Sequence, residues 1–392
     1  MQVTMAGASG TPPAQWRVSE AVFKQIAGFA STLEGGWRES MAVADVTVAM
    51  VWPSQPHTGT ADEVGRAQSN SNAVVDFVLR ALEDTTVLAT DRDFLLSNAP
   101  EISALMDYWD VVPAFVAKVE ASVVVGLRRV WDETSPEEAY AQLLVFQGSP
   151  MRHNAADTFF AVPRFWDYAN AQPVSENEAV RPECWVKSLY LHSAKSGHDL
   201  SRFTQLEKLS GAHRDLTGVA VPESVVGVAS LNLYCAKNVP AGLISVALRD
   251  RVPSINLDYC DLTGVAVPES LEGMENLILS DTEHVPAGLI SCALRDGVTH
   301  LDLTGCDLTG VAVPESVVGV ASLCLHGAQN IPADLISRAV RDGVTHLDLT
   351  GCDLTGVAVP ESLRGVFLRL WRATNIPAEL ISVVKRDGVT LL

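Results

Sequence analysis

Basic residues are scarce in this 392-residue chain. Lysine and arginine together number 28, against 47 aspartates and glutamates, and the formal net charge is −19. Nucleic-acid binding needs clustered lysine and arginine to displace counterions from phosphates, and docking on anionic lipid needs the same positive charge. The composition therefore predicts that neither nucleic acid nor a membrane is among the partners.

Long apolar runs are missing as well. The longest, Met41 to Trp52, is interrupted by Asp45 and falls well short of the roughly 20 residues that a membrane-spanning helix needs. The first fifteen residues lack the basic start and the apolar run of a secretory signal. We therefore expect an intracellular, cytoplasmic protein.

The cysteines do not form a disulfide framework. Their number, seven, is odd, and Cys260, Cys306 and Cys352 recur at a fixed interval. If they lie on alternate parallel strands, their Cα atoms are separated by roughly 10 Å, which is too far for a disulfide. Free thiols are typical of a reducing compartment, in agreement with an intracellular location.

What the chain does have is a repeat. The segment DLTGVAVPES occurs four times, beginning at Asp215, Asp261, Asp307 and Asp353, each 46 residues after the last. A fixed period of this length predicts stacked supersecondary units. Leu-x-Leu pairs recur within it at alternating intervals, 24 residues from Leu277 to Leu301 and 22 from Leu301 to Leu323. Each period therefore contains two units.

The segments VTHLDLTGCDL and VASLCLHGAQNI resemble the LxxLxLxx(N/C)xL signature of leucine-rich repeat proteins, over residues 186–392. The resemblance implies an α/β solenoid with one short parallel strand per unit on the concave face, and turns and short helices on the convex face. One unit type continues as PADLISRAVRDG, Pro332 to Gly343, which predicts a helix with proline at its first position and glycine at its end. The VPES units are too short for more than a turn.

The resemblance also assigns a role to the position that carries Asn or Cys in the signature. Cys260, Cys306 and Cys352 match it, and this implies a buried ladder in which they satisfy backbone groups. We interpret them as structural rather than redox or catalytic thiols. In the other unit type this position holds Ala236, Thr282, Ala328 and Ala373. Alanine has no side-chain donor, so local irregularity is expected there.

Alternation along a strand directs the leucines inward and the residues between them to the concave surface. A rigid repeat scaffold with varied exposed side chains favours protein–protein interaction, without catalytic residues. The predicted partner-binding residues are Asn232, Tyr234, Asn256, Asp258, His300, Asp302, His326, His346, Asp348, Arg369 and Trp371.

No metal or cofactor is predicted. His300 with Asp302, and His346 with Asp348, are ligand types for transition metals, but they are copies of one duplicated segment and would lie roughly 10 Å apart. The acidic residues of DLTGVAVPES repeat too regularly for one catalytic pair, so we interpret them as solvated turn residues.

A separate N-terminal domain is predicted because seven of the eight tryptophans precede the repeats. Residues 1–153 are expected to be mainly helical, with helices near 19–33, 114–131 and 135–146. Residues 154–185, with three prolines and little periodicity, are expected to be an irregular connection. Residues 186–392 are expected to form the solenoid.

Three alternatives stay open. Val18 to Trp52 is similar to an F-box without its leading Leu-Pro, which implies a helical module that docks on a ubiquitin-ligase adaptor and a substrate receptor as the function. A structural subunit of a larger assembly is the second alternative, and an enzyme within residues 1–185 is the third. Val389 to Leu392 align with the start of a strand, Val344 to Leu347, so we expect the C-terminal edge to pair with a partner or a second copy.

Overall fold

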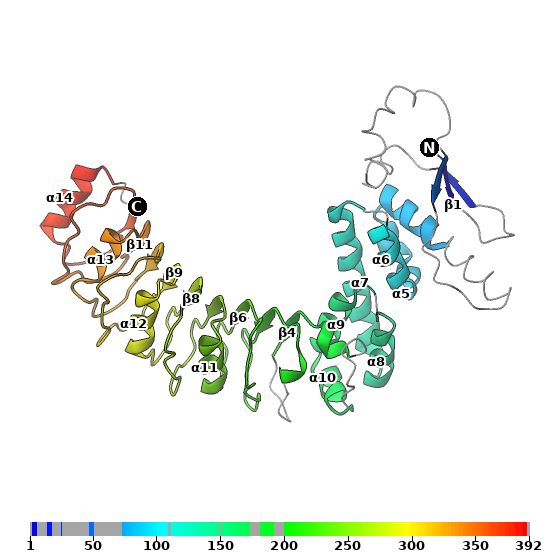
Figure 1. Ribbon diagram of the computed structural model, residues 1–392, viewed down its shortest axis with the longest axis horizontal. Helices are drawn as coiled ribbons and strands as arrows, with labels where there is room; N and C mark the ends of the chain where they lie inside the picture. Colours follow the sequence, from blue (N-terminus) through cyan, green and yellow to red (C-terminus); the bar gives the residue numbers. More distant parts are fainter. Residues whose placement is uncertain are drawn as a thin grey trace, which may run out of the picture. The chain divides into compact units, whose positions relative to one another are not determined.

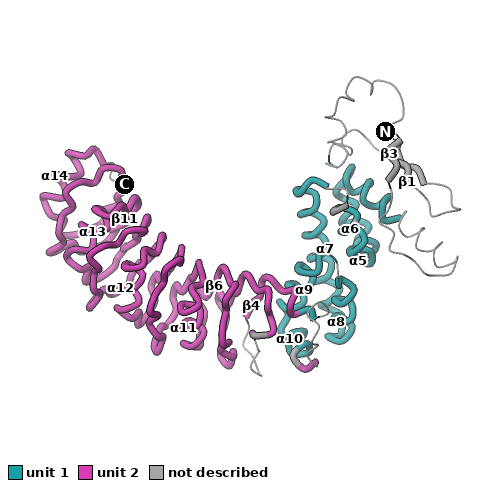
Figure 2. The backbone as a smooth tube through the Cα atoms, viewed as in Figure 1, with its two compact units in different colours: residues 1–169, 174–182 teal, residues 170–173, 183–392 magenta. Residues whose placement is uncertain are grey.

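The computed structural model describes residues 2–5, 14–17, 25, 47–50, 73–108, 111–147, 149, 151–172, 181–191 and 200–389. The chain divides into two compact units (Figure 2). Unit 1 comprises residues 1–169 with 174–182, and unit 2 comprises residues 170–173 with 183–392. Each unit has its own buried apolar core.

Helices dominate the described part of unit 1 (Figure 1). A helix over residues 73–83 is followed by α4 (Val87–Thr90), α5 (Arg92–Ser97), α6 (Ala99–Tyr108), α7 (Pro113–Glu133), α8 (Pro136–Leu144), α9 (Arg152–Phe160) and α10 (Pro163–Asn170). The helices predicted near 114–131 and 135–146 are confirmed by α7 and α8. Both have proline in the first turn, and Ser135 caps α8 by accepting from the backbone N–H of Glu138 at 3.2 Å.

The prediction of an irregular connection over residues 154–185 is wrong for most of the described span, because α9 and α10 lie within it. Pro163 begins α10 rather than breaking a helix. Phe159 and Phe165 stack with ring centroids 4.8 Å apart, and both meet the edge of Trp131. The aromatic contacts, rather than sequence periodicity, hold these helices in the core.

Strands also occur in the N-terminal region that was expected to be mainly helical. β1 (Gln2–Met5) pairs antiparallel with β2 (Ala14–Arg17) and parallel with β3 (Thr47–Met50). β3 lies in the F-box-like segment, where the resemblance implies helix, and its Thr-Val content favours a strand. The helix expected near 19–33 and most of the F-box-like segment lie outside the described residues.

Unit 2 contains a nine-stranded, all-parallel sheet in which every strand neighbours the next strand along the chain. One leucine or isoleucine from each strand lines up across the sheet, and these residues are at most 2% exposed. The strands are β4 (Ser188–Tyr190), β5 (Lys208–Ser210), β6 (Ser230–Asn232), β7 (Ser254–Asn256), β8 (Asn276–Ile278), β9 (His300–Asp302), β10 (Ser322–Cys324), β11 (His346–Asp348) and β12 (Phe367–Arg369).

Four helices follow alternate strands, on the side of unit 2 away from the strands (Figure 1): α11 (Ala241–Arg249), α12 (Ala287–Arg295), α13 (Leu335–Arg341) and α14 (Ala378–Asp387). The short 3-10 helices η3 (Pro182–Trp185) and η4 (Leu200–Arg202) lie near the start of the unit. Proline stands just outside α11, α12 and α14 as the N-cap, one position earlier than predicted. The predicted glycine stop is confirmed at Gly388, a left-handed C-cap.

At the end of each of these four helices, an Arg–Asp pair forms hydrogen bonds with the backbone of the VPES segment in the preceding unit. In the third copy, Arg341 Nε lies 2.7 Å from Asp342 Oδ1, and Arg341 Nη2 donates to the carbonyl of Glu315 at 2.6 Å. Asp342 Oδ2 accepts from the backbone N–H of Val317 at 2.9 Å. Arg341 lowers the pKa of Asp342, so the carboxylate is ionised under all but strongly acidic conditions.

Across the described ranges, every helix is too short or too polar to cross a membrane.

Candidate functional site

The eleven predicted partner-binding residues share one property: none of them is buried, although the leucines between them are buried on every strand from β6 to β11. Six are exposed and five are half-buried. They lie on strands or just after them, so the predicted alternation is confirmed. We refer to these residues as the strand face: Asn232, Tyr234, Asn256, Asp258, His300, Asp302, His326, His346, Asp348, Arg369 and Trp371.

Several strand-face residues are held in place by the backbone that follows them. Asp302 Oδ1 accepts from the backbone N–H of Thr304 at 2.9 Å, and Asp348 Oδ1 accepts from that of Thr350 at 2.9 Å. Asn232 and Asn256 make the same contact two residues on. These Asx turns fix one oxygen of each side chain and so orient the group. The sequence contains a signal for them that the prediction did not use, an Asn or Asp at the end of β6, β7, β9 and β11.

Negative charge gathers on alternate strands of this face. Asp258 follows β7, Asp302 ends β9 and Asp348 ends β11. Burial raises the pKa of Asp258, and the charge of Asp302 raises it further. The thiol of Cys324, between Asp302 and Asp348, also has a raised pKa, mainly through burial and in part through those two carboxylates. The carboxylates therefore create a shared negative potential.

The last strand supplies positive and aromatic side chains. Arg369 Nη1 lies 3.4 Å from Asp348 Oδ2, and the guanidinium of Arg372 lies 4.2 Å from the ring centre of Trp371. A hollow of about 230 Å³ opens beside them, lined by Ser322, Leu323, Cys324, His346, Leu347, Asp348, Phe367 and Arg369. This end of the face is already partly neutralised by the chain itself.

A row of aromatic side chains lies at the end of the strand face near β6 and β7, and it was not predicted from the sequence. Tyr234 meets the edge of His213 at 4.8 Å and of Tyr259 at 5.9 Å between ring centroids, and Tyr259 is 54% exposed. His213 and Tyr259 lie in the turn after a strand, at positive φ, where Gly305 stands two units after Tyr259. A glycine at the equivalent position indicates a left-handed backbone conformation, which is unfavourable for residues with a side chain. This glycine is the sequence signal that identifies His213 and Tyr259 as unusual.

The cysteine ladder exists as the resemblance implied. The thiols of Cys260, Cys306 and Cys352 donate to main-chain carbonyl oxygens 27 residues earlier, at 3.1, 3.1 and 2.8 Å. Thr282 does the same through its hydroxyl, which donates to Leu257 at 2.8 Å. Burial raises the pKa of the three thiols to about 11, 12 and 11. All three remain protonated donors near neutral pH.

The expected irregularity at the alanine positions is wrong. The backbone N–H of Ala236 donates to Leu233 and that of Ala328 to Leu325, both at 2.8 Å. The equivalent bond joins Cys306 to Leu303 at 3.0 Å. The turn is therefore made by the backbone in every unit from β6 to β12, and the side-chain donor adds a contact without determining the conformation.

The aspartate that opens each DLTGVAVPES copy is exposed, as predicted, but it is also bonded. Asp307 Oδ1 accepts from the N–H and hydroxyl of Thr309, at 3.0 and 2.7 Å, and from the side-chain amide of Asn330 at 2.8 Å. The amide and the hydroxyl lower the pKa of Asp307. These aspartates join neighbouring units, so they are framework residues rather than merely solvated ones.

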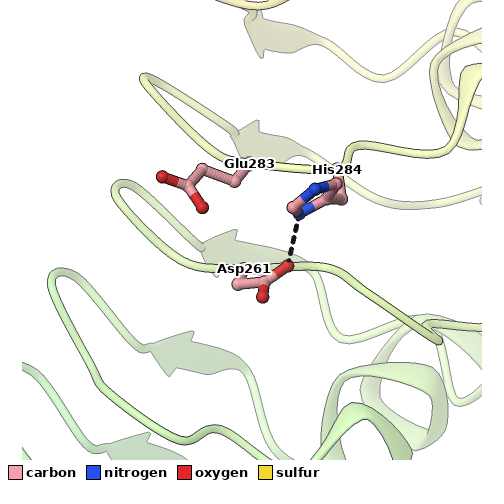
Figure 3. Close-up of side chains that lie close together, drawn as sticks. All are labelled: Asp261, Glu283 and His284. Carbon is pink, nitrogen blue, oxygen red and sulfur yellow. Dashed lines mark hydrogen bonds and ion pairs between the residues drawn. The ribbon is translucent and has the colours of Figure 1, made fainter.

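Asp261, Glu283 and His284 are the one group of described residues whose ligand atoms could converge on a metal ion, all lying within 4.8 Å of one another (Figure 3). His284 Nδ1 lies 2.9 Å from Asp261 Oδ1. In the other three copies an asparagine makes the matching contact with the aspartate: Asn238, Asn330 and Asn375. The contact between His284 and Asp261 therefore takes the place of the Asn–Asp contact that joins neighbouring units in the other copies. His300 and His346 do not join any such group in the described part of the chain.

Unit 1 contains a larger hollow of about 490 Å³, which bears on the enzyme alternative. It is lined mostly by apolar side chains, and Asp93 is the one titratable residue among those that line it. Gln142 also lines it, but its Oε1 already accepts from the Trp131 indole at 2.8 Å. The described lining offers no second group to complete an acid–base pair.

No protein-family model, no curated protein and no solved structure matches the chain.

Proposed function

We propose that residues 186–392 form a leucine-rich repeat solenoid, and that the chain binds a protein partner through the strand face without catalysing a reaction. The parallel strands in chain order, the buried leucines and the cysteine ladder support the first part of the proposal. The chemistry of the strand face supports the second.

One observation carries the binding function: the DLTGVAVPES framework is constant across its four copies, whereas the residues at the strand ends vary. In DLTGVAVPES the leucine and first valine are buried and the aspartate is bonded in all four copies. The last residue of each strand from β6 to β12, none of which is buried, instead varies: Asn232, Asn256, Ile278, Asp302, Cys324, Asp348 and Arg369. A framework that repeats and a surface that does not are typical of recognition.

The remaining features agree with a non-enzymatic, intracellular role. All seven cysteines are free, which suits a reducing compartment. The carboxylates of the strand face lie on alternate strands rather than in one cleft, so they suit contact with an extended partner better than proton transfer.

Affinity purification followed by mass spectrometry tests the proposal. The bait is the full-length chain, compared with a triple variant of exposed strand-face residues, His300→Ala, His326→Ala and Trp371→Ala. The matched control changes two exposed valines in the VPES turns, Val226→Ala and Val318→Ala, which are 78% and 65% exposed. We expect the strand-face variant to lose the partner and the control to retain it.

Equal recovery of partner by the wild type and the triple variant would refute binding through this face. Recovery of a cullin adaptor that depends on residues 18–52 would instead favour the ubiquitin-ligase alternative. A monodisperse monomer in light scattering would argue against a permanent structural subunit.

A further inference from the structure

The aromatic row consists of His213, Tyr234 and Tyr259, and two of its members have a strained backbone. His213 and Tyr259 both have a φ of 57°. The same turn position holds Gly327 and Gly351 in later units, where an added Cβ atom would meet no neighbour closer than 3.8 Å. Glycine stands there for its backbone freedom and not for lack of space. The turn therefore does not require the rings of His213 and Tyr259, although it accommodates them at a conformational cost.

The rings of the aromatic row follow three neighbouring strands, β5, β6 and β7. Tyr234 lies nearly perpendicular to both neighbours, at 87° to His213 and 82° to Tyr259, and Tyr259 is 54% exposed. The face of an aromatic ring carries partial negative charge and attracts cations. In the described part of the chain, no arginine or lysine stacks on these three rings.

A carboxylate stands beside the most exposed ring of the row. Asp281 occupies the turn position of Tyr259 in the next unit, after β8, and it is exposed. Its carboxylate lies close enough to Tyr259 to raise the pKa of the phenol. Among the residues that the structure describes, Asp281 forms no ion pair. The site therefore combines an aromatic face with a negative charge that the chain does not neutralise.

The last repeat unit shows what such a combination receives in this fold. There the guanidinium of Arg372 lies 4.2 Å from the ring centre of Trp371, and that of Arg369 lies 5.4 Å from the ring centre of Phe367. Arg369 also reaches the carboxylate of Asp348, on the neighbouring strand, at 3.4 Å. A ring from one strand and a carboxylate from the next thus accept an arginine that the chain itself supplies.

We propose that the aromatic row binds an arginine side chain of the protein partner, with its guanidinium stacked on the ring of Tyr259 and paired with the carboxylate of Asp281. The inference rests on the proposed binding function and adds the residue that the partner presents to this end of the strand face. Arginine fits better than lysine because a planar guanidinium can stack on a ring and donate to a carboxylate at the same time. The unneutralised charge of Asp281 makes the contact electrostatically complementary.

The test titrates the full-length protein, with isotope-labelled tyrosine rings, with the peptide acetyl-Gly-Arg-Gly-amide and follows the tyrosine signals by NMR. A second peptide carries lysine in place of arginine. Tyr259→Gly removes the ring and relieves the strained backbone, and Asp281→Asn removes the charge but keeps a residue type that tolerates positive φ. The matched control is Arg251→Gly, which relieves a φ of 56° after α11, outside the row. The equivalent residues after the other three helices of unit 2 are Gly297, Gly343 and Gly388.

We expect the arginine peptide to shift the ring signals of Tyr234 and Tyr259 equally in the wild type and in Arg251→Gly, with a dissociation constant in the millimolar range. Tyr259→Gly, followed through Tyr234, and Asp281→Asn should bind it at least about threefold more weakly. Both glycine variants should raise the urea midpoint, because each relieves a left-handed side chain.

Three results would overturn the inference. The first is the absence of a shift in the wild type, or an unchanged affinity in Tyr259→Gly and Asp281→Asn. The second is equal binding of the lysine peptide, which would show that charge alone is recognised. The third is a lower urea midpoint for Tyr259→Gly, which would assign the ring a structural role instead.

The two proposals fail separately. If the purified partner is lost with the strand-face triple variant but retained by Tyr259→Gly, the binding function stands and the aromatic row is not its arginine site. If the partner is retained by the triple variant, the binding function itself fails, whatever the peptide does.

Discussion

The thiol of Cys306 donates to the carbonyl oxygen of Leu279 at 3.1 Å, across 27 residues of chain. The contact links neighbouring repeat units through the core, where both residues are almost fully buried. Thr282 makes the same kind of contact with a hydroxyl, so the ladder position needs a small side chain with a donor rather than a thiol in particular.

Replacing this donor should weaken the solenoid measurably. Cys306→Ala removes the bond and is expected to lower the free energy of unfolding by about 1 kcal/mol, while Cys306→Thr should cost less because it restores a donor. Urea denaturation followed by circular dichroism measures both. Equal destabilisation by alanine and threonine would show that packing, not the hydrogen bond, matters at this position.

The ladder thiols should be unreactive in the folded protein. Their pKa values of about 11 to 12 leave almost no thiolate at neutral pH, and their side chains are buried. Mass spectrometry after brief iodoacetamide treatment should find Cys260, Cys306 and Cys352 unmodified in buffer and modified in urea. Rapid native labelling at any of the three would contradict the buried ladder.

The Arg–Asp pair after α13 should stabilise the array. Asp342→Ala leaves the backbone N–H of Val317 without its acceptor and Arg341 without its ion pair, and should lower the free energy of unfolding by about 1–3 kcal/mol. The loss should appear as a lower urea midpoint. Glu315→Ala is the control, since Arg341 binds only the backbone carbonyl of that residue. Similar losses in both variants would show that the Arg341–Asp342 pair does not stabilise the array.

Acid should destabilise unit 2. The Thr217 hydroxyl, followed by Asn238, lowers the pKa of Asp215 to about 2, and Arg341 lowers that of Asp342. A carboxyl with a depressed folded pKa stabilises the fold above its unfolded pKa and loses that contribution as the pH falls through the folded value. Urea midpoints should therefore decline from about pH 4 toward about pH 2. Asp215→Asn should show a shallower decline, and a flat profile in the wild type would contradict the assignment.

Asp258 should behave in the opposite way. Because burial and Asp302 raise its folded pKa, its ionised form opposes folding, and the stability gained from the protonated form is lost as the pH rises through the folded value. Asp258→Asn should raise the free energy of unfolding at neutral pH by less than about 1 kcal/mol, since the side chain is only half-buried and solvent screens part of the effect. A lower urea midpoint for this variant would show that the carboxylate is structurally required.

The periodic part of this protein could be predicted from local sequence patterns. The 46-residue interval, the alternation of Leu301 with its exposed neighbours and the glycine at the end of α14 are local patterns, and each has one backbone conformation that satisfies it. The strand positions and their exposure followed from those patterns, and the structural use of Cys306 followed from the resemblance to the leucine-rich repeat signature.

Features that depend on contacts between distant residues could not be predicted in this way. The helices α9 and α10 are held by aromatic contacts with Trp131, which sequence periodicity does not report. His213, Tyr234 and Tyr259 form a row because successive turns stack, and Asp302 lacks an internal cation because its neighbour on β10 is Cys324. Such relationships arise from which units lie side by side, so the physical character of the strand face emerged only once the strands were placed in register.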